Sequence, residues 1–161
     1  TPRHKLMEEN RKGPGVKFPP PLVYVPWMIL GGILQKFYPM DMGIPFDHQY
    51  WGLGMVIFGM LFLITIRRKF KKAATNIKPW EPTNNIITTG IYGRSRNPIY
   101  LGFNIFPIGL GIFFNNFWVL LGFIPAAITL YHIAIKKEEA YLEEKFGDEY
   151  RAYKSNVRRW I

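Results

Sequence analysis

The sequence predicts an all-α, polytopic integral membrane protein with about four transmembrane helices and a cytoplasmic C-terminal helix. Four runs, at 22–38, 51–66, 98–114 and 117–135, together contain a single charged side chain, Lys36. Each run would extend about 24–29 Å as a helix, close to the thickness of a hydrocarbon core. None has a polar stripe that would face water, so four buried helices of a water-soluble domain are the weaker interpretation.

The basic residues predict the orientation of these spans. Five lie in residues 1–18, eight in residues 67–97 and seven in residues 136–161, which together make twenty of the 21 Lys and Arg residues. The connection 39–50 holds none. Four alternating spans would place all three basic segments on one side, and the positive-inside rule makes that side the cytoplasm. We therefore expect both termini to be cytoplasmic, in a bacterial inner membrane or an endomembrane.

Length and composition limit the domain organisation and the kind of partner. A chain of 161 residues predicts one membrane domain, 1–161, with a cytoplasmic lead-in at 1–18, a cytoplasmic loop at 67–97 and a C-terminal helix at 136–161. The net charge of +10 fits an anionic partner, but its distribution along one membrane face favours lipid and disfavours nucleic acid. The run Arg67–Lys72 is therefore interpreted as a topology signal and anionic-lipid anchor.

Other classes of site are disfavoured by the residues present. The absence of cysteine excludes disulfides, thiol nucleophiles and Cys-ligated zinc. His4 and His48 are too far apart in sequence to suggest a metal site, and His132 is interpreted as a packing or interfacial residue. Asn104 is expected to hydrogen-bond between helices rather than to face a ligand. Asn115 and Asn116 should form a tight hairpin between the last two spans.

The segment before the third span has the features of an anion site. Asn97 suits a helix N-cap and Pro98 suits the first helical position, so the helix should start there. The amides and dipole of that end, with Arg94 and Arg96 beside them, could bind a carboxylate or phosphate. Gly90 and Gly93 would allow close backbone approach. A plain capped helix start with arginines reaching the interface remains the alternative.

A second candidate segment follows the fourth span. Ile135, Leu142 and Phe146 form one helical stripe, and Glu138 and Glu139 lie within it. One of these carboxylates should therefore face inward, where it needs a partner or a ligand. A ligand site and a salt bridge to Arg94 or Arg96 are equally consistent with the spacing. Gly147 should end the helix, with Asp148 capping a last turn through Tyr153.

Together these segments resemble the membrane methyltransferases that include isoprenylcysteine carboxyl methyltransferase and the phospholipid N-methyltransferases. The first motif of that family reads roughly Gly-x-Tyr-x-x-x-Arg-His-Pro-x-Tyr, and the second is a Glu-Glu pair followed by Phe-Gly-x-x-Tyr-x-x-Tyr. The resemblance covers residues 79–160. It is carried by these residues: Gly90, Tyr92, Arg96, Pro98, Tyr100, Glu138, Glu139, Phe146, Gly147, Tyr150 and Tyr153.

The resemblance implies S-adenosylmethionine as the methyl donor and a lipophilic or lipid-anchored acceptor. Arg96 would take the donor carboxylate, Glu138 or Glu139 the ammonium or ribose, and Tyr92 and Tyr100 would flank the adenine or sulfonium. Arg96 and Glu139 are thus the candidate catalytic residues. The candidate cofactor-binding residues are Gly90, Tyr92, Arg96, Asn97, Pro98, Tyr100, Glu138 and Glu139.

One departure from the motif matters, because Asn97 replaces the usual His. No acid–base role can be carried over to Asn97, although its amide can still cap the helix or donate to a ligand. A second hypothesis is a non-catalytic membrane subunit that kept the family fold and acts in a larger protein complex. A reductase is a weaker third reading, since the chain is short for the bundle that such enzymes need.

Overall fold

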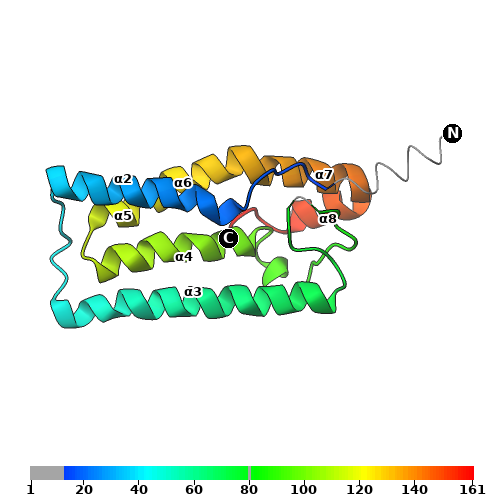
Figure 1. Cartoon of the computed structure of the whole chain (residues 1–161). Helices are drawn as coiled ribbons and strands as arrows, with labels where there is room; N and C mark the ends of the chain where they lie inside the picture. The colour runs from blue at the N-terminus through cyan, green and yellow to red at the C-terminus, as the bar shows by residue number, and fades with distance from the viewer. Residues whose placement is uncertain (1–12, 80) are drawn as a thin grey trace. The chain divides into compact units, whose positions relative to one another are not determined.

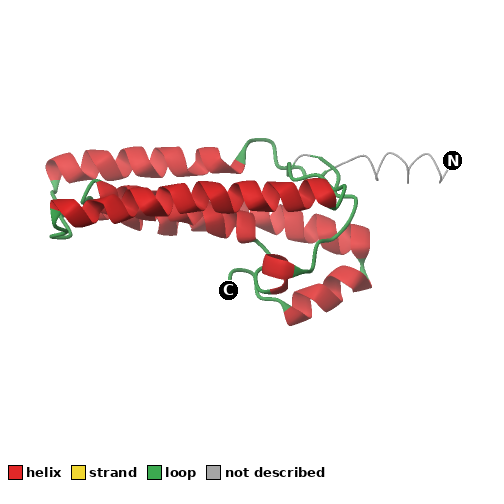
Figure 2. Ribbon diagram, turned by 90° about the horizontal axis from the view of Figure 1, so that it is seen from below, coloured by secondary structure: helices red, strands yellow, loops and turns green. Residues whose placement is uncertain are grey.

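The computed structural model describes residues 13–79 and 81–161, and these residues form helices and loops without a strand (Figure 2). The predicted all-α class is confirmed. Arg3, His4, Lys5, Arg11 and Lys12 lie outside the described residues. The elements are η1 (Pro20–Val23), α2 (Tyr24–Phe37), α3 (Phe46–Lys72), η2 (Gly90–Gly93), α4 (Pro98–Phe113), α5 (Phe117–Leu121), α6 (Phe123–Leu130), η3 (Tyr131–Ile135), α7 (Lys136–Phe146) and α8 (Asp148–Asn156).

Two helices are long and apolar enough to cross a membrane. The first is α3, and the second runs from Phe117 to Phe146 through α5, α6, η3 and α7. The helix α4 is also apolar but has only 16 residues. These helices indicate an integral membrane protein, while the predicted number of four spans and their orientation remain predictions.

The helix α3 is longer than the predicted span 51–66. It begins at Phe46 and continues through Lys72, so the basic run Arg67–Lys72 is helical rather than part of the following loop. The extension is consistent with the helix dipole, because Asp47 lies in the first turn and Lys69, Lys71 and Lys72 lie in the last.

The described chain divides into two compact units. Residues 20–65 and 99–130 form the first, here named the helical unit. Residues 13–19, 66–98 and 131–161 belong to the second, here named the motif unit because it contains Gly90–Pro98 and the Glu138-Glu139 pair.

Close helix approach through glycine organises the helical unit. Figure 1 shows α2 beside α5 and α6, and α4 beside α3. A Cβ at Gly31 would lie 2.8 Å from the Val119 nitrogen, and one at Gly52 would lie 2.5 Å from the Phe113 nitrogen. Small residues at these points therefore let the helix backbones approach each other.

The predicted hairpin between α4 and α5 is confirmed at Asn115 and Asn116. Asn115 adopts a positive φ of 50°, and its side-chain oxygen accepts the backbone N–H of Met42 at 3.0 Å. Asn116 caps α5 by accepting the N–H of Val119 at 3.0 Å. The turn thus uses the tolerance of asparagine for left-handed backbone and its capping amide.

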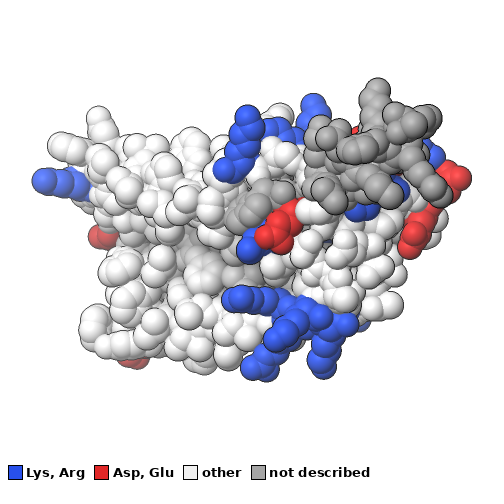
Figure 3. Space-filling model, turned by 45° about the vertical axis from the view of Figure 1, so that its right-hand side comes forward, with Lys and Arg blue, Asp and Glu red and all other residues white. Residues whose placement is uncertain are grey.

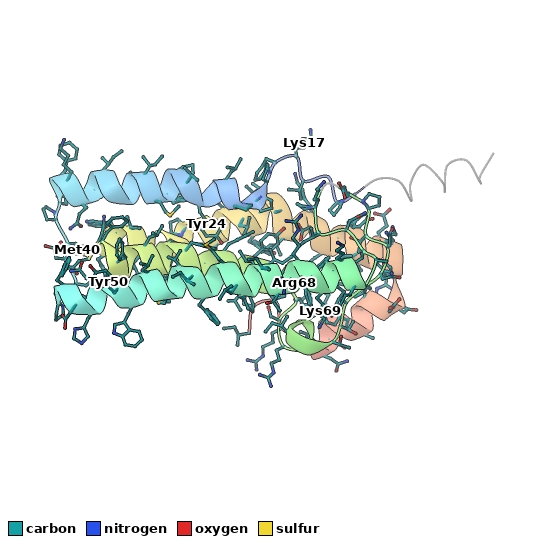
Figure 4. All side chains as sticks on the ribbon, turned by 60° about the horizontal axis from the view of Figure 1, so that its bottom comes forward. Lys17, Tyr24, Met40, Tyr50, Arg68 and Lys69 are labelled. Atoms are coloured by element: carbon teal, nitrogen blue, oxygen red, sulfur yellow. The ribbon has the colours of Figure 1, made fainter. Side chains whose placement is uncertain are left out.

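The predicted interhelical bond of Asn104 is also confirmed. The Tyr24 hydroxyl on α2 donates to the Asn104 side-chain oxygen on α4 at 2.8 Å. Tyr24 is buried, and Figure 4 shows its side chain among the helices. Much of the outer surface of this unit is apolar, and Figure 3 shows a wide region with almost no charged side chain. The large exposed apolar residues include Ile29, Ile33, Trp51, Ile57, Phe58, Leu61 and Ile128.

The motif unit has a core of tyrosines. Tyr150, Tyr153 and Val157 are buried together, and Ile86, Leu142 and Phe146 pack against them. Gly147, with a φ of +53°, separates α7 from α8, so the predicted helix end is confirmed. The helix α8 continues to Asn156, three residues beyond the expected end at Tyr153. The expected cap at Asp148 was wrong, because Asp148 is the first residue of α8 and Gly147 takes the N-cap position without a side-chain bond.

Candidate functional site

The segment Gly90–Asn97 is fixed by contacts within the motif unit. The Lys69 ammonium donates to the Thr89 carbonyl beside Gly90, which has a φ of +66°. The Tyr92 ring is buried edge-on against Phe70, with 5.7 Å between ring centroids. The Tyr153 hydroxyl donates to the Tyr92 carbonyl at 2.7 Å. Tyr92 is therefore part of the core of the motif unit. Lys69, which contacts Thr89, lies near the C-terminal end of α3 (Figure 4).

The tyrosines of this core keep their protons at neutral pH. Burial raises the pKa of Tyr92 well above its usual value, with the charges of Tyr153 and Glu138 adding to the effect. Burial also raises the pKa of Tyr153 to about 12. Burial is also the main cause of the raised pKa of Tyr150. The Glu139 carboxylate raises this pKa further, and the Arg96 guanidinium lowers it. These phenols are therefore neutral at that pH and do not act as bases.

The chain end lies along the segment that precedes α4. That helix begins at Pro98 as predicted, which puts the buried Asn97 at the N-cap position. The Asn97 amide donates to the carbonyl of Arg159 at 3.2 Å, and the Arg96 N–H donates to the carbonyl of Arg158 at 3.0 Å. Residues 95–97 are thus bound to residues 158–159.

Arg96 is the most deeply placed charged side chain of the first motif. Its side chain is only 8% exposed, and its Nη1 lies 3.5 Å from the Glu139 Oε1 atom. Its Nε and Nη1 atoms have no hydrogen-bond acceptor. Arg94, in contrast, is exposed, so the structure does not bring together the two arginines of the predicted anion site.

Glu139 faces inward, as the helical stripe predicted for one carboxylate of the pair. It is 9% exposed in the first turn of α7, whereas Glu138 is half-buried. Its Oε1 accepts from the Arg159 Nε at 2.9 Å and its Oε2 from the Arg159 Nη2 at 3.1 Å. The ionic tie to Arg96, one of the two open alternatives, is present, and a ligand role for Glu139 stays a prediction.

Sequence reasoning missed Arg159 as a member of this site. Its guanidinium carbon lies 4.9 Å from the centre of the Tyr131 ring, and the hydrogen bond to Glu139 raises its pKa. Tyr131 opens the π-helical turn η3, a type of turn that is frequent at functional sites. The available signal was an inward Glu139 that needed a strong partner, whereas Arg159 was counted only as a topology charge.

The remaining predicted site residues are distributed as follows. Pro98 is fully buried, Gly90 is exposed, and Tyr100 is buried in the part of α4 that belongs to the helical unit. His132 is exposed and contacts the ring of Tyr131. Within residues 13–79 and 81–161, no group of three His, Asp or Glu side chains could hold a metal ion.

The cluster of Arg96, Glu139 and Arg159, here named the charge cluster, has two guanidinium groups for one carboxylate. Arg159 makes the shorter contacts to Glu139, so Arg96 is the less satisfied cation. A buried guanidinium with nitrogens that lack acceptors is costly unless an anion completes it. The carboxylate or phosphate of a small molecule would supply the acceptors that Arg96 lacks.

Known proteins resemble the chain across these segments. The family model described as phospholipid methyltransferase matches residues 48–149, which include Gly90–Tyr100 and the Glu138-Glu139 pair. An uncharacterized protein of Haemophilus influenzae is 40% identical over 63 residues, which are 39% of this chain and 100% of that protein.

Two further relatives are named protein-S-isoprenylcysteine O-methyltransferase. The one from Schizosaccharomyces pombe is 38% identical over 72 residues, which are 45% of this chain and 30% of that relative. The one from Xenopus laevis is 30% identical over 110 residues, which are 66% of this chain and 38% of that relative. The chain thus spans about a third of the length of these two relatives. Because the family match takes in more than half of the chain and both motif segments, the chain belongs to the phospholipid methyltransferase family.

Proposed function

We propose that this chain is a membrane-embedded methyltransferase that moves a methyl group from S-adenosylmethionine to a lipophilic acceptor. The acceptor would be a prenylcysteine-type carboxylate or a lipid amine. The observation that carries the proposal is the buried Arg96, whose Nε and Nη1 lack hydrogen-bond acceptors in a segment that matches a methyltransferase family. The names of the two O-methyltransferase relatives support the same class of reaction.

The residues of the charge cluster fit the amino-acid end of the donor. Arg96 would bind the donor carboxylate through Nε and Nη1, the two nitrogens that lack a hydrogen-bond acceptor, assisted by the backbone amides at the start of α4. Glu139 would bind the ammonium through lone pairs that Arg159 does not use, since a carboxylate offers about four acceptor positions. Glu138, next to it on α7, would serve the ribose hydroxyls.

When bound, S-adenosylmethionine supplies an electrophilic methyl group on a sulfonium. The task of the chain is then to hold the donor and acceptor in line and to exclude water, because positioning supplies much of the rate acceleration in such a displacement. Tyr100, at the start of α4, is proposed to flank the adenine or sulfonium. The buried Tyr92 packs edge-on against Phe70, so it would support the core of the motif unit rather than contact the donor directly.

The membrane placement is part of the proposal. Both termini and the motif unit would lie on the cytoplasmic side, with four spans in the bilayer and the basic end of α3 at anionic lipid headgroups. Arg67, Arg68, Lys71 and Lys72 are exposed at that end, and Figure 4 marks Arg68 there. An acceptor with a lipid tail would reach the site from the bilayer.

A non-catalytic subunit is the second candidate, and one contact favours it. Arg159 already satisfies both oxygens of Glu139, as expected if the donor site had closed on itself. That candidate predicts a stable complex with a partner protein and no affinity for the donor. Co-purification with mass spectrometry of the bound proteins would distinguish it from an enzyme.

Donor binding tests the proposal directly. The purified protein in lipid nanodiscs is titrated calorimetrically with S-adenosylhomocysteine, and labelled S-adenosylmethionine is then offered with lipid extract or a prenylcysteine analogue. Arg96→Ala should abolish binding, whereas Arg68→Ala, which removes an exposed arginine, should leave it unchanged. An absence of donor binding by the wild-type protein in every lipid composition would contradict the enzyme and favour the subunit.

A further inference from the structure

We propose that Arg159 is a positioning residue of the donor site, which fixes Glu139 and joins the chain end to the first motif. This inference rests on the proposed function and adds a residue to it. Arg159 lies beyond residues 48–149, the part of the chain that the family model matches, and outside both sequence motifs.

The first argument is the geometry of the contact. The two bonds from Arg159 to Glu139, at 2.9 and 3.1 Å, form a fork in which each nitrogen meets a different oxygen. A forked arginine–carboxylate pair fixes the plane of the carboxylate as well as its position. The Tyr131 ring at 4.9 Å holds the guanidinium from its face. Glu139 is thus held in one orientation.

The second argument is that the backbone of the same residue contacts the first motif. The Arg159 carbonyl accepts from the Asn97 amide at 3.2 Å and lies 3.5 Å from the Ser95 hydroxyl. The neighbouring Arg158 carbonyl accepts the N–H of Arg96. One residue therefore connects Glu139 on α7 to the segment that carries Arg96, two parts of the chain that are more than forty positions apart in sequence.

The third argument concerns Arg96. If Arg159 were absent, Arg96 would be the nearest cation to Glu139 and would be drawn into a full ion pair with it. Arg159 supplies the shorter contacts and leaves the Arg96 Nη1 atom in a longer ion pair of 3.5 Å, with Nε and Nη1 both lacking a hydrogen-bond acceptor. The positive charge left over is suited to the carboxylate of a donor. Arg159 therefore keeps Arg96 available, although it need not touch the donor itself.

Substitutions at Arg159 separate this role from simple stabilisation. Arg159→Gln removes the charge and the fork, and Arg159→Lys keeps the charge but loses the fork. Arg151→Gln is the matched control, because Arg151 also pairs with glutamate, but on the exposed surface of α8. Each variant is titrated with S-adenosylhomocysteine in nanodiscs, its thermal midpoint is measured, and the KM for a prenylcysteine analogue is determined.

We expect Arg159→Gln to weaken binding of S-adenosylhomocysteine by about tenfold or more, as the loss of a hydrogen bond between charged groups would. Arg159→Lys should fall between it and the wild type, and Arg151→Gln should bind normally. The acceptor KM should change less than twofold, because the effect acts through Glu139 and Arg96. A merely structural role would instead lower the thermal midpoint and disturb both ligands together.

Several results would overturn the inference. If Arg159→Gln bound S-adenosylhomocysteine as tightly as the wild type, Arg159 would have no part in donor binding. If it bound more tightly, Arg159 would compete with the donor for Glu139. If Arg159→Gln does not fold, the Arg159→Lys variant tests the inference instead. Binding of S-adenosylhomocysteine by Arg159→Lys equal to that of the wild type would contradict a need for the forked contact. If the wild-type protein binds no donor, the proposed function fails together with this inference, whereas normal donor binding by the Arg159 variants removes the inference alone.

Discussion

The helical unit and the motif unit bury polar groups by different means. In the helical unit, the buried Tyr24 hydroxyl pairs with Asn104 as one neutral hydrogen bond, and the helices meet at glycines such as Gly52. In the motif unit, a buried carboxylate lies between two guanidinium groups, and Arg96 keeps nitrogens without acceptors. The first unit leaves no such cation unpaired among its described side chains.

This difference is consistent with the proposal that the motif unit binds the donor. Neutral hydrogen-bonded pairs and close backbone contacts hold helices together without a ligand. A buried cation without its full set of acceptors lowers stability, and a bound anion would offset that loss. Substitutions should therefore affect the helical unit through packing and the motif unit through charge and protonation.

The largest expected effect on stability concerns the packing of the helical unit. Gly52→Ala would place a methyl group 2.5 Å from the Phe113 nitrogen and also against the Gly109 carbonyl, and backbone atoms cannot move aside cheaply. We expect a loss of about 1–3 kcal/mol, measured as a lower thermal midpoint in detergent.

Gly54→Ala is the control for that substitution. It lies two positions along the same helix and has no atom within 4 Å of an added methyl group. It should be neutral or slightly stabilising, because alanine favours the helix. Equal losses in both variants would show that helix propensity, and not close approach of α3 and α4, decides the stability of this unit.

Pattern and capping chemistry predicted several features of the helices and their turns. The start of α4 at Pro98, the turn at Asn115-Asn116 and the Asn104 hydrogen bond follow from local rules and were predicted from the residues themselves. The predicted span ended at Ile66, and the helix α3 continues six residues into the segment expected to be a loop. Apolarity stops at Ile66, but a helix can continue in water with lysines in its last turn.

The motif unit was predictable only in part, because its partners lie far apart in sequence. The inward face of Glu139 followed from the periodicity of α7. Its pairing with Arg159 depends on how α8 and the chain end fold back, which no local rule specifies. Spacing also did not distinguish the exposed Arg94 from the buried Arg96, because residues 94–97 lie outside a regular helix whose period could indicate an inward face.

A second prediction tests the tyrosine core of the motif unit. Tyr153→Phe removes the hydrogen bond to the Tyr92 carbonyl and should cost about 1 kcal/mol near neutral pH. The pKa of Tyr153 is raised to about 12 from its usual 10.0, so the unfolded chain ionises first. The stability that this shift provides is present below pH 10 and is lost as the pH rises towards 12.

The measurement is thermal unfolding of the wild type and the variant between pH 8 and pH 11. Tyr153→Phe should start lower and then lose less stability as the pH rises, while Tyr38→Phe, which changes an exposed phenol, should follow the wild type. If the stability of the wild type and of Tyr153→Phe fell in parallel with rising pH, the buried Tyr153 phenol would not contribute to the pH dependence. The motif unit would then resemble the helical unit in having no stability that depends on protonation.

The smallest effect is expected at the neutral pair of the helical unit. Tyr24→Phe leaves the Asn104 oxygen without its donor, and hydrogen bonds between membrane helices contribute about 0.6 kcal/mol on average. The double variant Tyr24→Phe/Asn104→Leu should recover most of that loss, because replacing both partners by apolar groups removes the unsatisfied oxygen. Thermal midpoints in one detergent would compare the three proteins. A loss of methyl transfer without a loss of stability would instead place Asn104 at the ligand, and polar chemistry would then no longer be confined to the motif unit.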